Sequence, residues 1–280
     1  MSDVNGFVPQ AGTVFFIGAG PGAPDLITVR GRAIVERADL VLFADSLVRP
    51  EACAAARSGA TVLGSASMTL HEMVDLLATA AAEGKIVARL HSGDPSVYGA
   101  IHEQLAALEA RGVRCEVVPG VSSAFAAAAA VGCEMTVPGV AQTVIFTRAS
   151  GRASPVPERE ALRSLAAHGA SMAIFLSAVL AKRVVAELRA GGYADDTPVV
   201  VAFRVTWPDE ALLRTTLGRV AAEVRAAGWT KQALFLVGPA FSPRAALAEQ
   251  RSRLYDPSYR HLFREPRQQG ARERPQSPLV

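Results

Sequence analysis

The chain has 280 residues, of which 50% are hydrophobic and 20% are charged. These values predict a globular α/β protein with two domains and a large buried core. The formal net charge is +3, but the excess of Arg lies after residue 240, and residues 1–240 carry about −1. A tail rich in Pro, Gln and Arg with few interleaved aromatics is typical of a solvated extension, so we expect no nucleic-acid partner.

The cysteine content and the hydropathy exclude other classes. Cys53, Cys115 and Cys133 are odd in number and widely spaced, which indicates neither a disulfide framework nor a zinc site. No apolar run approaches the length of a membrane span, and "MSDVNGFVPQ" lacks the pattern of a secretory signal. We therefore expect a cytoplasmic protein with no metal ion and no membrane partner.

Residues 12–133 predict a first domain with a mostly parallel sheet. Aliphatic runs ("TVFFI", "DLVLF", "KIVARL", "RCEVVP") alternate with amphipathic stretches such as "LHEMVDLLATAAAE". This alternation is typical of βαβ units. The stretch "VSSAFAAAAAVG" predicts a last helix of this domain, with Ser122 as its cap and Gly132 at its end.

Residues 134–241 predict a second α/β domain with a mixed sheet. After a linker, "CEMTVPGVAQ", strand patterns are more frequent and helices are fewer, with helices expected near 158–167 and 178–190. Residues 242–280 are expected to form a partly disordered extension. The cleft between the two domains is the expected ligand site.

The glycine-rich stretch "TVFFIGAGPGAPDLIT" follows the first predicted strand. Its G-x-G-x-x-A spacing from Gly18 matches a dinucleotide fingerprint. Pro21 and Pro24 oppose helical angles, however, and the first good helix cap is Thr28, so no helix N-terminus faces a phosphate here. The stretch is either a plain turn or a loop that allows close backbone approach to an elongated ligand.

Two further strand ends carry unusual loops. In "HSGDPSVYG", Gly93 and Pro95 fix a turn around Asp94, whose carboxylate can accept hydrogen bonds from a ligand, and a helix is expected to begin near Tyr98. The stretch "VPGVSS" places two hydroxyls at a helix start. Because the carboxyl ends of parallel strands share one edge of a sheet, the three loops predict a binding site there.

The stretches "GAGPGAPDLIT", "GDPSVYG" and "PGVSS", in this order, resemble the hallmarks of the tetrapyrrole methyltransferase family. Members of this family transfer a methyl group from S-adenosylmethionine to ring carbons of corrin and sirohaem precursors. The resemblance extends from Thr13 to Phe241, and Ala23 departs from it because many members have Asp there. It implies two α/β domains with the active site in the interdomain cleft, and a homodimer.

Other segments are similar to the family members that methylate precorrin-4 at ring carbon 11 in cobalamin (vitamin B12) synthesis. They include "ADSLVRPE", "TRASGRASPVPE", "RVTWPDE" and "SRLYDPSYRHLFR". The resemblance implies S-adenosyl-L-methionine as methyl donor, S-adenosyl-L-homocysteine as product and precorrin-4 as substrate. A cobalt-containing form of the substrate and a non-catalytic binding module remain alternatives.

The resemblance also implies which residues form the cofactor site. Leu176 and Val205 are expected beside the adenine, although core packing explains them equally well. Asp45 matches an Asp that acts as a base in sirohaem-type relatives; the alternative is a surface Asp that caps the next segment. The expected cofactor-binding residues are Pro21, Ser92, Gly93, Asp94, Val97, Ser122, Ser123, Leu176 and Val205.

Three arginines are candidates for binding the acetate and propionate groups of a tetrapyrrole. Arg148, Arg152 and Arg204 lie at or near predicted strand ends, and the planar guanidinium binds a carboxylate through two hydrogen bonds. The alternative for each is a solvated surface position. We expect a structural role for His91, while Trp207 either lines the cleft or anchors a turn.

Overall fold

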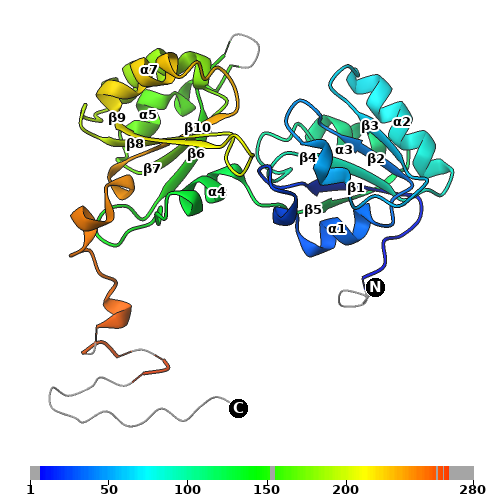
Figure 1. Ribbon diagram of the computed structural model, residues 1–280, viewed down its shortest axis with the longest axis horizontal. Coiled ribbons are helices and arrows are strands. Elements are labelled where there is room, and N and C mark those ends of the chain that lie inside the picture. The colour runs from blue at the N-terminus through cyan, green and yellow to red at the C-terminus, as the bar shows by residue number, and fades with distance from the viewer. Residues whose placement is uncertain (1–6, 152–154, 257, 261, 265–280) are drawn as a thin grey trace.

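The computed structural model describes residues 7–151, 155–256, 258–260 and 262–264. They form two α/β units that lie side by side, with the C-terminal extension leading away from the second unit (Figure 1). Each unit is built on a five-stranded sheet. This agrees with the expected fold of two α/β domains, although the division at residue 133 stays a prediction.

The first sheet has the strand order β3-β2-β4-β1-β5, and all its neighbouring strands run parallel. Apolar side chains cover both faces of the sheet and form two cores, one under α1 and one under α2 and α3. The prediction of a mostly parallel first sheet is confirmed. The elements are β1 (Thr13–Gly18), α1 (Val29–Val35), β2 (Leu40–Phe43), β3 (Thr61–Gly64), α2 (Leu70–Ala82), β4 (Val87–His91), α3 (His102–Glu109) and β5 (Arg114–Val118).

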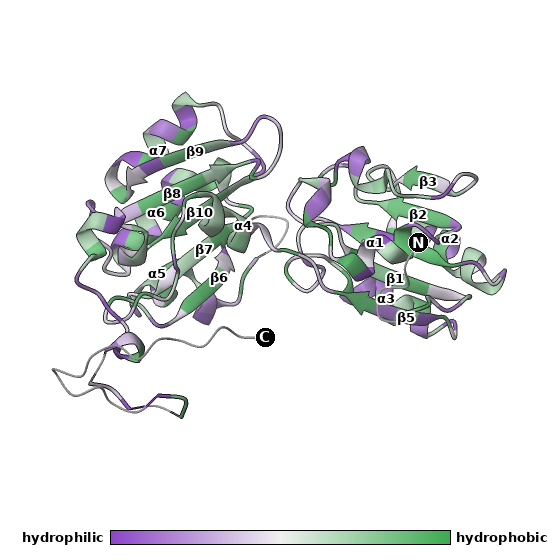
Figure 2. Ribbon diagram, turned by 60° about the horizontal axis from the view of Figure 1, so that its bottom comes forward, coloured by the Kyte–Doolittle hydropathy of each residue, from purple (hydrophilic) through white to green (hydrophobic). Residues whose placement is uncertain are grey.

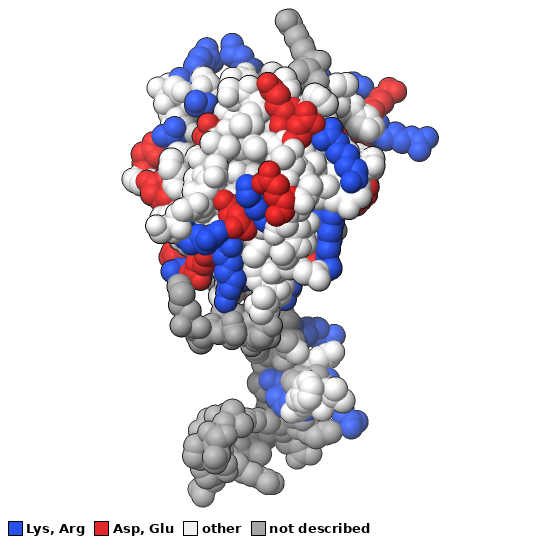
Figure 3. Space-filling model, turned by 90° about the vertical axis from the view of Figure 1, so that its right-hand side faces the viewer, with Lys and Arg blue, Asp and Glu red and all other residues white. Residues whose placement is uncertain are grey.

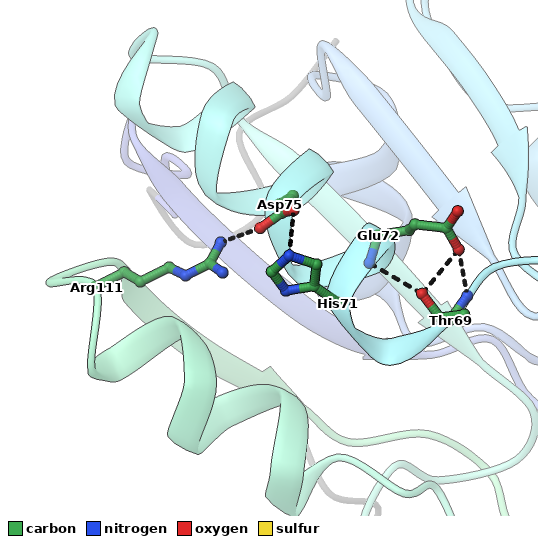
Figure 4. Close-up of polar contacts among 5 residues, drawn as sticks. All are labelled: Thr69, His71, Glu72, Asp75 and Arg111. Carbon is green, nitrogen blue, oxygen red and sulfur yellow. Dashed lines mark hydrogen bonds and ion pairs between the residues drawn. The ribbon is translucent and has the colours of Figure 1, made fainter.

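Side-chain caps fix where the helices of the first unit begin. The Thr28 hydroxyl accepts a hydrogen bond from the Gly31 amide at 3.1 Å, as the sequence predicts for the start of α1. Thr69 and Glu72 form a reciprocal capping box at the start of α2 (Figure 4). On the next turn, Asp75 pairs with both His71 and Arg111, which connects α2 to the end of α3.

The second sheet has the order β6-β7-β10-β8-β9, with β6 parallel to β7 and the other pairs antiparallel. The prediction of a mixed second sheet is therefore confirmed. Its apolar strands lie in the middle of the unit between helices on both faces (Figure 2). The elements are β6 (Val144–Arg148), α5 (Leu162–Ala166), β7 (Ser171–Phe175), α6 (Ala181–Ala190), β8 (Pro198–Phe203), β9 (Ala211–Thr216), α7 (Leu217–Ala226) and β10 (Ala233–Val237).

Helix α4 (Ser123–Ala130) connects the two units in space. The sequence prediction assigned it to the first domain, but its alanines pack against β7, β8 and β10 of the second sheet (Figure 1). The Ser122 hydroxyl caps it, as predicted, by accepting from the Ala124 amide at 3.4 Å. The chain therefore crosses between the units at the loop before Ser122, which places that loop beside the second sheet.

Short 3₁₀ turns complete the described chain. They are Pro24–Leu26, Pro50–Cys53, Glu158–Glu160, Ala178–Leu180, Pro239–Phe241, Arg244–Leu247 and Arg253–Tyr255.

Basic and acidic side chains are interspersed on the end face of the first unit, without a continuous basic patch in that view (Figure 3).

Candidate active site

Three strand-end loops of the first unit pack backbone against backbone. The Gly93 amide after β4 donates to the Gly20 carbonyl after β1 at 2.8 Å. A Cβ at Gly120, after β5, would lie 2.2 Å from the Gly93 carbonyl oxygen, so no side chain fits there. The sequence predicted that these loops share one edge of the sheet, and the structure brings them into direct contact.

The Asp94 carboxylate links the loop after β4 to the loop after β5 by a hydrogen bond. One of its oxygens accepts from the Gly120 amide and the other accepts from the Ser96 amide, both at 2.8 Å. From the sequence, Asp94 was expected to accept hydrogen bonds from a ligand. Both oxygens instead hold neighbouring backbone, so the main contribution of Asp94 here is to fix the shape of the loops.

The second unit contacts the glycine-rich loop through the segment after β8. Trp207 Nε1 donates to the Pro21 carbonyl at 3.0 Å, and the Thr206 hydroxyl accepts from the Ala23 amide at 2.9 Å. A Cβ at Gly22 would lie 2.2 Å from Trp207 Cδ1. Gly22 is therefore required because the indole ring packs directly on the backbone of this loop.

A cavity of about 280 Å³ lies between these segments of the two units. Its walls are mainly apolar, with a few polar groups at the loop ends, which is typical of a small-molecule site. All nine positions expected to bind the cofactor line it, namely Pro21, Ser92, Gly93, Asp94, Val97, Ser122, Ser123, Leu176 and Val205. Further lining residues include Leu47, Tyr98, Phe175, Ala202, Arg204, Trp207, Gln232 and Leu234.

Leu176 and Val205 differ in how they line the cavity. Leu176 is 63% exposed and has a left-handed backbone with φ of 52°, so core packing does not explain its side chain. Val205 is buried in the core beneath α4 and also contributes to the cavity wall. The sequence left open whether each residue lines the cofactor site or packs in the core. Leu176 lines the cavity without packing in the core, whereas Val205 does both.

Left-handed backbone is concentrated at this site. In the described part of the chain, six non-glycine residues have positive φ, and four of them line the cavity. Such conformations cost of order 1–3 kcal/mol each and cluster at functional sites. The left-handed angles of Tyr98 and Ala100 also explain why the helix expected near Tyr98 begins only at His102. The six residues are Tyr98, Ala100, Leu176, Arg204, Thr206 and Gln232.

Asp45 lies at the same sheet edge but is not part of the cavity wall. It follows β2, whose last residue, Phe43, pairs with Leu90 of β4. Asp45 and the loop that contains Ser92 therefore lie at the same edge of the sheet. Its carboxylate is exposed and accepts from the Ala66 amide at 2.7 Å. Leu47, two residues further on, does line the cavity.

The candidate substrate-binding arginines have different surroundings. Arg204 lines the cavity, but its guanidinium already binds Gln232 at 2.8 Å and Asp209, and it lies 5.0 Å from the Trp207 ring centre. Arg148 ends β6 and donates to the Pro155 carbonyl at 3.3 Å. Arg152 lies outside the described residues.

Tyr98 connects the cavity to the region of Arg148. Burial raises the pKa of the Tyr98 hydroxyl, and the positive charge of Arg148 opposes this shift. The Tyr98 ring also packs on Phe175 of the second unit, with the ring centres 5.3 Å apart. Tyr98 therefore lies close to charges of both signs on the second unit, the positive charge of Arg148 and the negative charge of Glu160.

Two buried basic residues of β4 were not predicted as site residues. Arg89 and His91 are each only 4% exposed. Burial lowers the pKa of Arg89 to about 10, an effect that the charge of Asp45 opposes, and burial together with Arg89 lowers the pKa of His91 to about 3. At neutral pH Arg89 is thus charged and His91 neutral. The sequence signal was the presence of two basic residues at alternate positions of a central strand.

No cluster of three metal-ligating side chains occurs among the described residues. None of the described helices has the length and hydropathy needed to cross a membrane.

The two-sheet α/β fold with a cavity between its units is that of a methylase. Residues 13–221 match the family model of the tetrapyrrole (corrin/porphyrin) methylases. The chain belongs to this family, as the resemblance of its three loop motifs implied.

Individual relatives support the family assignment over almost the whole chain. The cobalt-precorrin-4 C(11)-methyltransferase of Priestia megaterium is 50% identical over 251 residues, which cover 90% of this chain and 97% of the relative. The precorrin-4 C(11)-methyltransferase of a Sinorhizobium species is 46% identical over 252 residues, covering 90% and 98%.

Solved structures agree with these sequence relatives. The structure of a cobalt precorrin-4 methyltransferase has a TM-score of 0.81 and 50% identity, and the match covers 83% of this chain and 97% of that one. A uroporphyrin-III C-methyltransferase from Thermus thermophilus in complex with S-adenosylhomocysteine has a TM-score of 0.66 and 26% identity, with coverage of 81% and 98%. This chain therefore shares its two-unit architecture with both of these structures.

Proposed function

We propose that the chain transfers a methyl group from S-adenosyl-L-methionine to ring carbon 11 of precorrin-4, a step of cobalamin biosynthesis. The observation that carries the proposal is the cavity between the two units, which is lined by all nine positions expected from the family resemblance. Relatives 46–50% identical over nine-tenths of the chain and named for this reaction support the choice of substrate.

The cavity has the chemistry that the methyl donor requires. Val205, Leu176 and Ala202 offer apolar surface for a flat adenine ring, while Ser122 and Ser123 place hydroxyls at its polar end. When bound, the donor supplies a methyl group on a positively charged sulfur. Because a methyl transfer is an in-line displacement, the main contribution of these rigid loops is orientation. The S-adenosylhomocysteine complex of the Thermus thermophilus relative supports this assignment.

The surroundings of the cavity provide groups for a polycarboxylate substrate. Arg148 and Arg204 offer positive charge on the second unit, and Arg152 is proposed as a third cation. Methylation of a ring carbon leaves charge or a proton to remove, and Asp45 is the proposed base because it lies at the same sheet edge as the Ser92 loop. S-adenosyl-L-homocysteine is the proposed product of the donor.

Assembly, location and the metal content of the substrate belong to the proposal as well. A homodimer, implied by the family resemblance, and a cytoplasmic location, inferred from the cysteine and hydropathy patterns, stay predictions. Relatives named for the cobalt-containing substrate and for the metal-free substrate are similarly identical to this chain. We propose the metal-free substrate first and the cobalt-containing one as the alternative.

Parallel turnover assays test the proposal. Purified protein is incubated with S-adenosylmethionine and either precorrin-4 or cobalt-precorrin-4, and kcat/KM is measured for each. Methylation of precorrin-4 with the higher kcat/KM supports the proposal. A preference for the cobalt-containing substrate selects the alternative, and tight cofactor binding with no turnover on either indicates a non-catalytic binding module.

A further inference from the structure

The buried guanidinium of Arg89 is unusual because its hydrogen-bond partners among the described residues are all uncharged. Arg89 Nη1 donates to the Ser65 hydroxyl at 2.9 Å, Nε donates to Gln104 Oε1 at 3.3 Å, and Nη2 contacts Met73 Sδ at 3.6 Å. A buried charge with only neutral partners is expensive, and a hydrophobic residue of similar size generally suits such a position as well. The position of Arg89 therefore calls for an explanation other than packing.

Arg89 is connected to Asp45 through the loop that follows β3. The Ser65 hydroxyl, which accepts from Arg89, donates in turn to the Phe43 carbonyl at 3.2 Å. The next residue of this loop, Ala66, donates its amide to the Asp45 carboxylate at 2.7 Å. Two hydrogen bonds, which meet at the Ser65 hydroxyl, thus connect the Arg89 guanidinium to the Phe43 carbonyl at the end of β2, two residues before Asp45.

The Asp45 side chain packs directly against the backbone at the start of this loop. A Cβ at Gly64 would lie 2.6 Å from Asp45 Cγ, so the carboxylate rests directly on the backbone at the end of β3. Any shift of residues 64–66 would therefore move the carboxylate. Asp45 is also the acidic side chain whose charge acts on Arg89, and the neutral His91 is the other titratable group beside it.

We propose that Arg89 is a positioning residue for the methyl transfer, which holds Ser65 and Ala66 beneath Asp45 and presents a buried positive charge to that carboxylate. This inference rests on the proposed function, in which Asp45 is the base. Arg89 does not line the cavity, so it acts on the substrate side through Asp45 and leaves cofactor binding unchanged.

Variants of Arg89 distinguish positioning from packing. Arg89→Met keeps the length of the side chain without its charge, and Arg89→Lys keeps the charge without the planar fork. If Arg89 only packs, the Met variant is at least as stable and as active as the Lys variant, because an unpaired buried ammonium is costly. If Arg89 positions Asp45, the Met variant has the lower kcat even where it is the more stable of the two.

The experiment measures kcat and KM with precorrin-4, the Kd of S-adenosylhomocysteine by calorimetry, and the thermal midpoint of each variant. We expect Arg89→Met to lower kcat at least about tenfold, with the cofactor Kd within about twofold of that of the unmodified protein. Ser65→Ala, which removes one link without altering either charged residue, should lower kcat in the same direction. Arg57→Met, in the same unit but bound to Asp39, is the matched control and should keep its kcat.

The combination of Arg89→Met with Asp45→Asn tests the connection itself. Since Arg89 acts through Asp45, the double variant should be no slower than Asp45→Asn alone. A normal kcat for Arg89→Met, a Met variant faster than the Lys variant, or a slow Arg89→Met beside a normal Asp45→Asn would overturn the inference. Failure of the unmodified protein to methylate any precorrin would instead overturn the proposed function.

Discussion

Trp207 Nε1 of the second unit donates a hydrogen bond to the Pro21 carbonyl of the first unit at 3.0 Å. The indole ring lies against Gly22 and lines the cavity, and the guanidinium groups of Arg49 and Arg204 lie 5.7 Å and 5.0 Å from its centre. This contact joins the glycine-rich loop to the other half of the cavity. The shape of the proposed cofactor site therefore depends on a bond between two domains.

Trp207→Phe should weaken cofactor binding, because it removes the donor to Pro21 while keeping an aromatic ring. The loss of one hydrogen bond of this kind costs about 1 kcal/mol, so we expect the Kd of S-adenosylhomocysteine to rise about fivefold. Calorimetry measures this directly. An unchanged Kd would show that the interdomain bond does not shape the cofactor site.

Gly22→Ala should have a larger effect on the same site. The new Cβ would lie 2.2 Å from Trp207 Cδ1, so the indole ring and the loop must move apart. We expect the Kd of S-adenosylhomocysteine to rise at least about tenfold, since the pocket walls are no longer preorganised. The matched control is Gly218→Ala, whose Cβ would lie 3.2–3.3 Å from atoms of Asp195, and neither of these residues lines the cavity. Equal Kd values for both variants would contradict this prediction.

Asp94→Asn should lower both stability and cofactor affinity. The carboxylate accepts from two backbone amides, and an Asn side chain can accept from only one of them. Leaving the other amide unpaired in a partly buried loop costs about 1–3 kcal/mol. Denaturant unfolding and calorimetry measure the two effects. A normal free energy of unfolding with a weakened cofactor would instead favour the direct ligand contact expected from the sequence.

Leu176→Asn separates a binding role from a packing role. Asn tolerates left-handed backbone and lacks the apolar surface of Leu, and the side chain it replaces is 63% exposed. We expect the free energy of unfolding to change by less than about 1 kcal/mol, whereas buried Leu truncations cost about 2–5 kcal/mol. The Kd of S-adenosylhomocysteine should rise severalfold. A large loss of stability with normal affinity would contradict the assignment of Leu176 to the adenine side.

The buried His91 makes folding sensitive to acid. Its pKa is lowered to about 3 by burial and by Arg89, so below pH 6.5 the unfolded chain binds a proton that the folded chain excludes. The contribution is complete above pH 6.5 and is lost as the pH falls toward 3. Between pH 7 and pH 5 the protein should lose up to about 2 kcal/mol more unfolding free energy than His91→Gln. Equal losses in the two proteins would show that His91 is not the group responsible.

The sequence predicted the local elements better than the contacts between units. Thr28 and Ser122 mark helix starts by their own side chains, and the parallel and mixed sheets follow from the spacing of apolar runs. By contrast, the side of the molecule on which α4 packs depends on its alanines fitting the second sheet, which its sequence alone does not specify. Left-handed backbone at Tyr98 and Ala100 likewise depends on tertiary contacts, so the expected start of α3 was wrong.

At the candidate site too, the sequence predicted some residues, and others became visible only in the structure. The nine residues that the family resemblance implied all line one cavity. Strand geometry explains the loops of the first unit, because the carboxyl ends of parallel strands share one edge of a sheet, but it does not explain Leu176 and Val205, which follow strands of the second sheet. The sequence left Trp207 open between lining the cleft and anchoring a turn, since its contact with Pro21 joins residues 186 positions apart. Arg89 was missed because a basic residue within a strand has no motif of its own, and its role is visible only when Ser65 and Asp45 lie beside it.

The most direct test of the account is the mass and carbon-13 NMR spectrum of the product formed from precorrin-4 and S-adenosylmethionine with a labelled methyl group. The account predicts one labelled methyl per tetrapyrrole, attached at ring carbon 11, with an equal amount of S-adenosylhomocysteine released. A tetrapyrrole recovered without label, or labelled at another ring carbon, would contradict it.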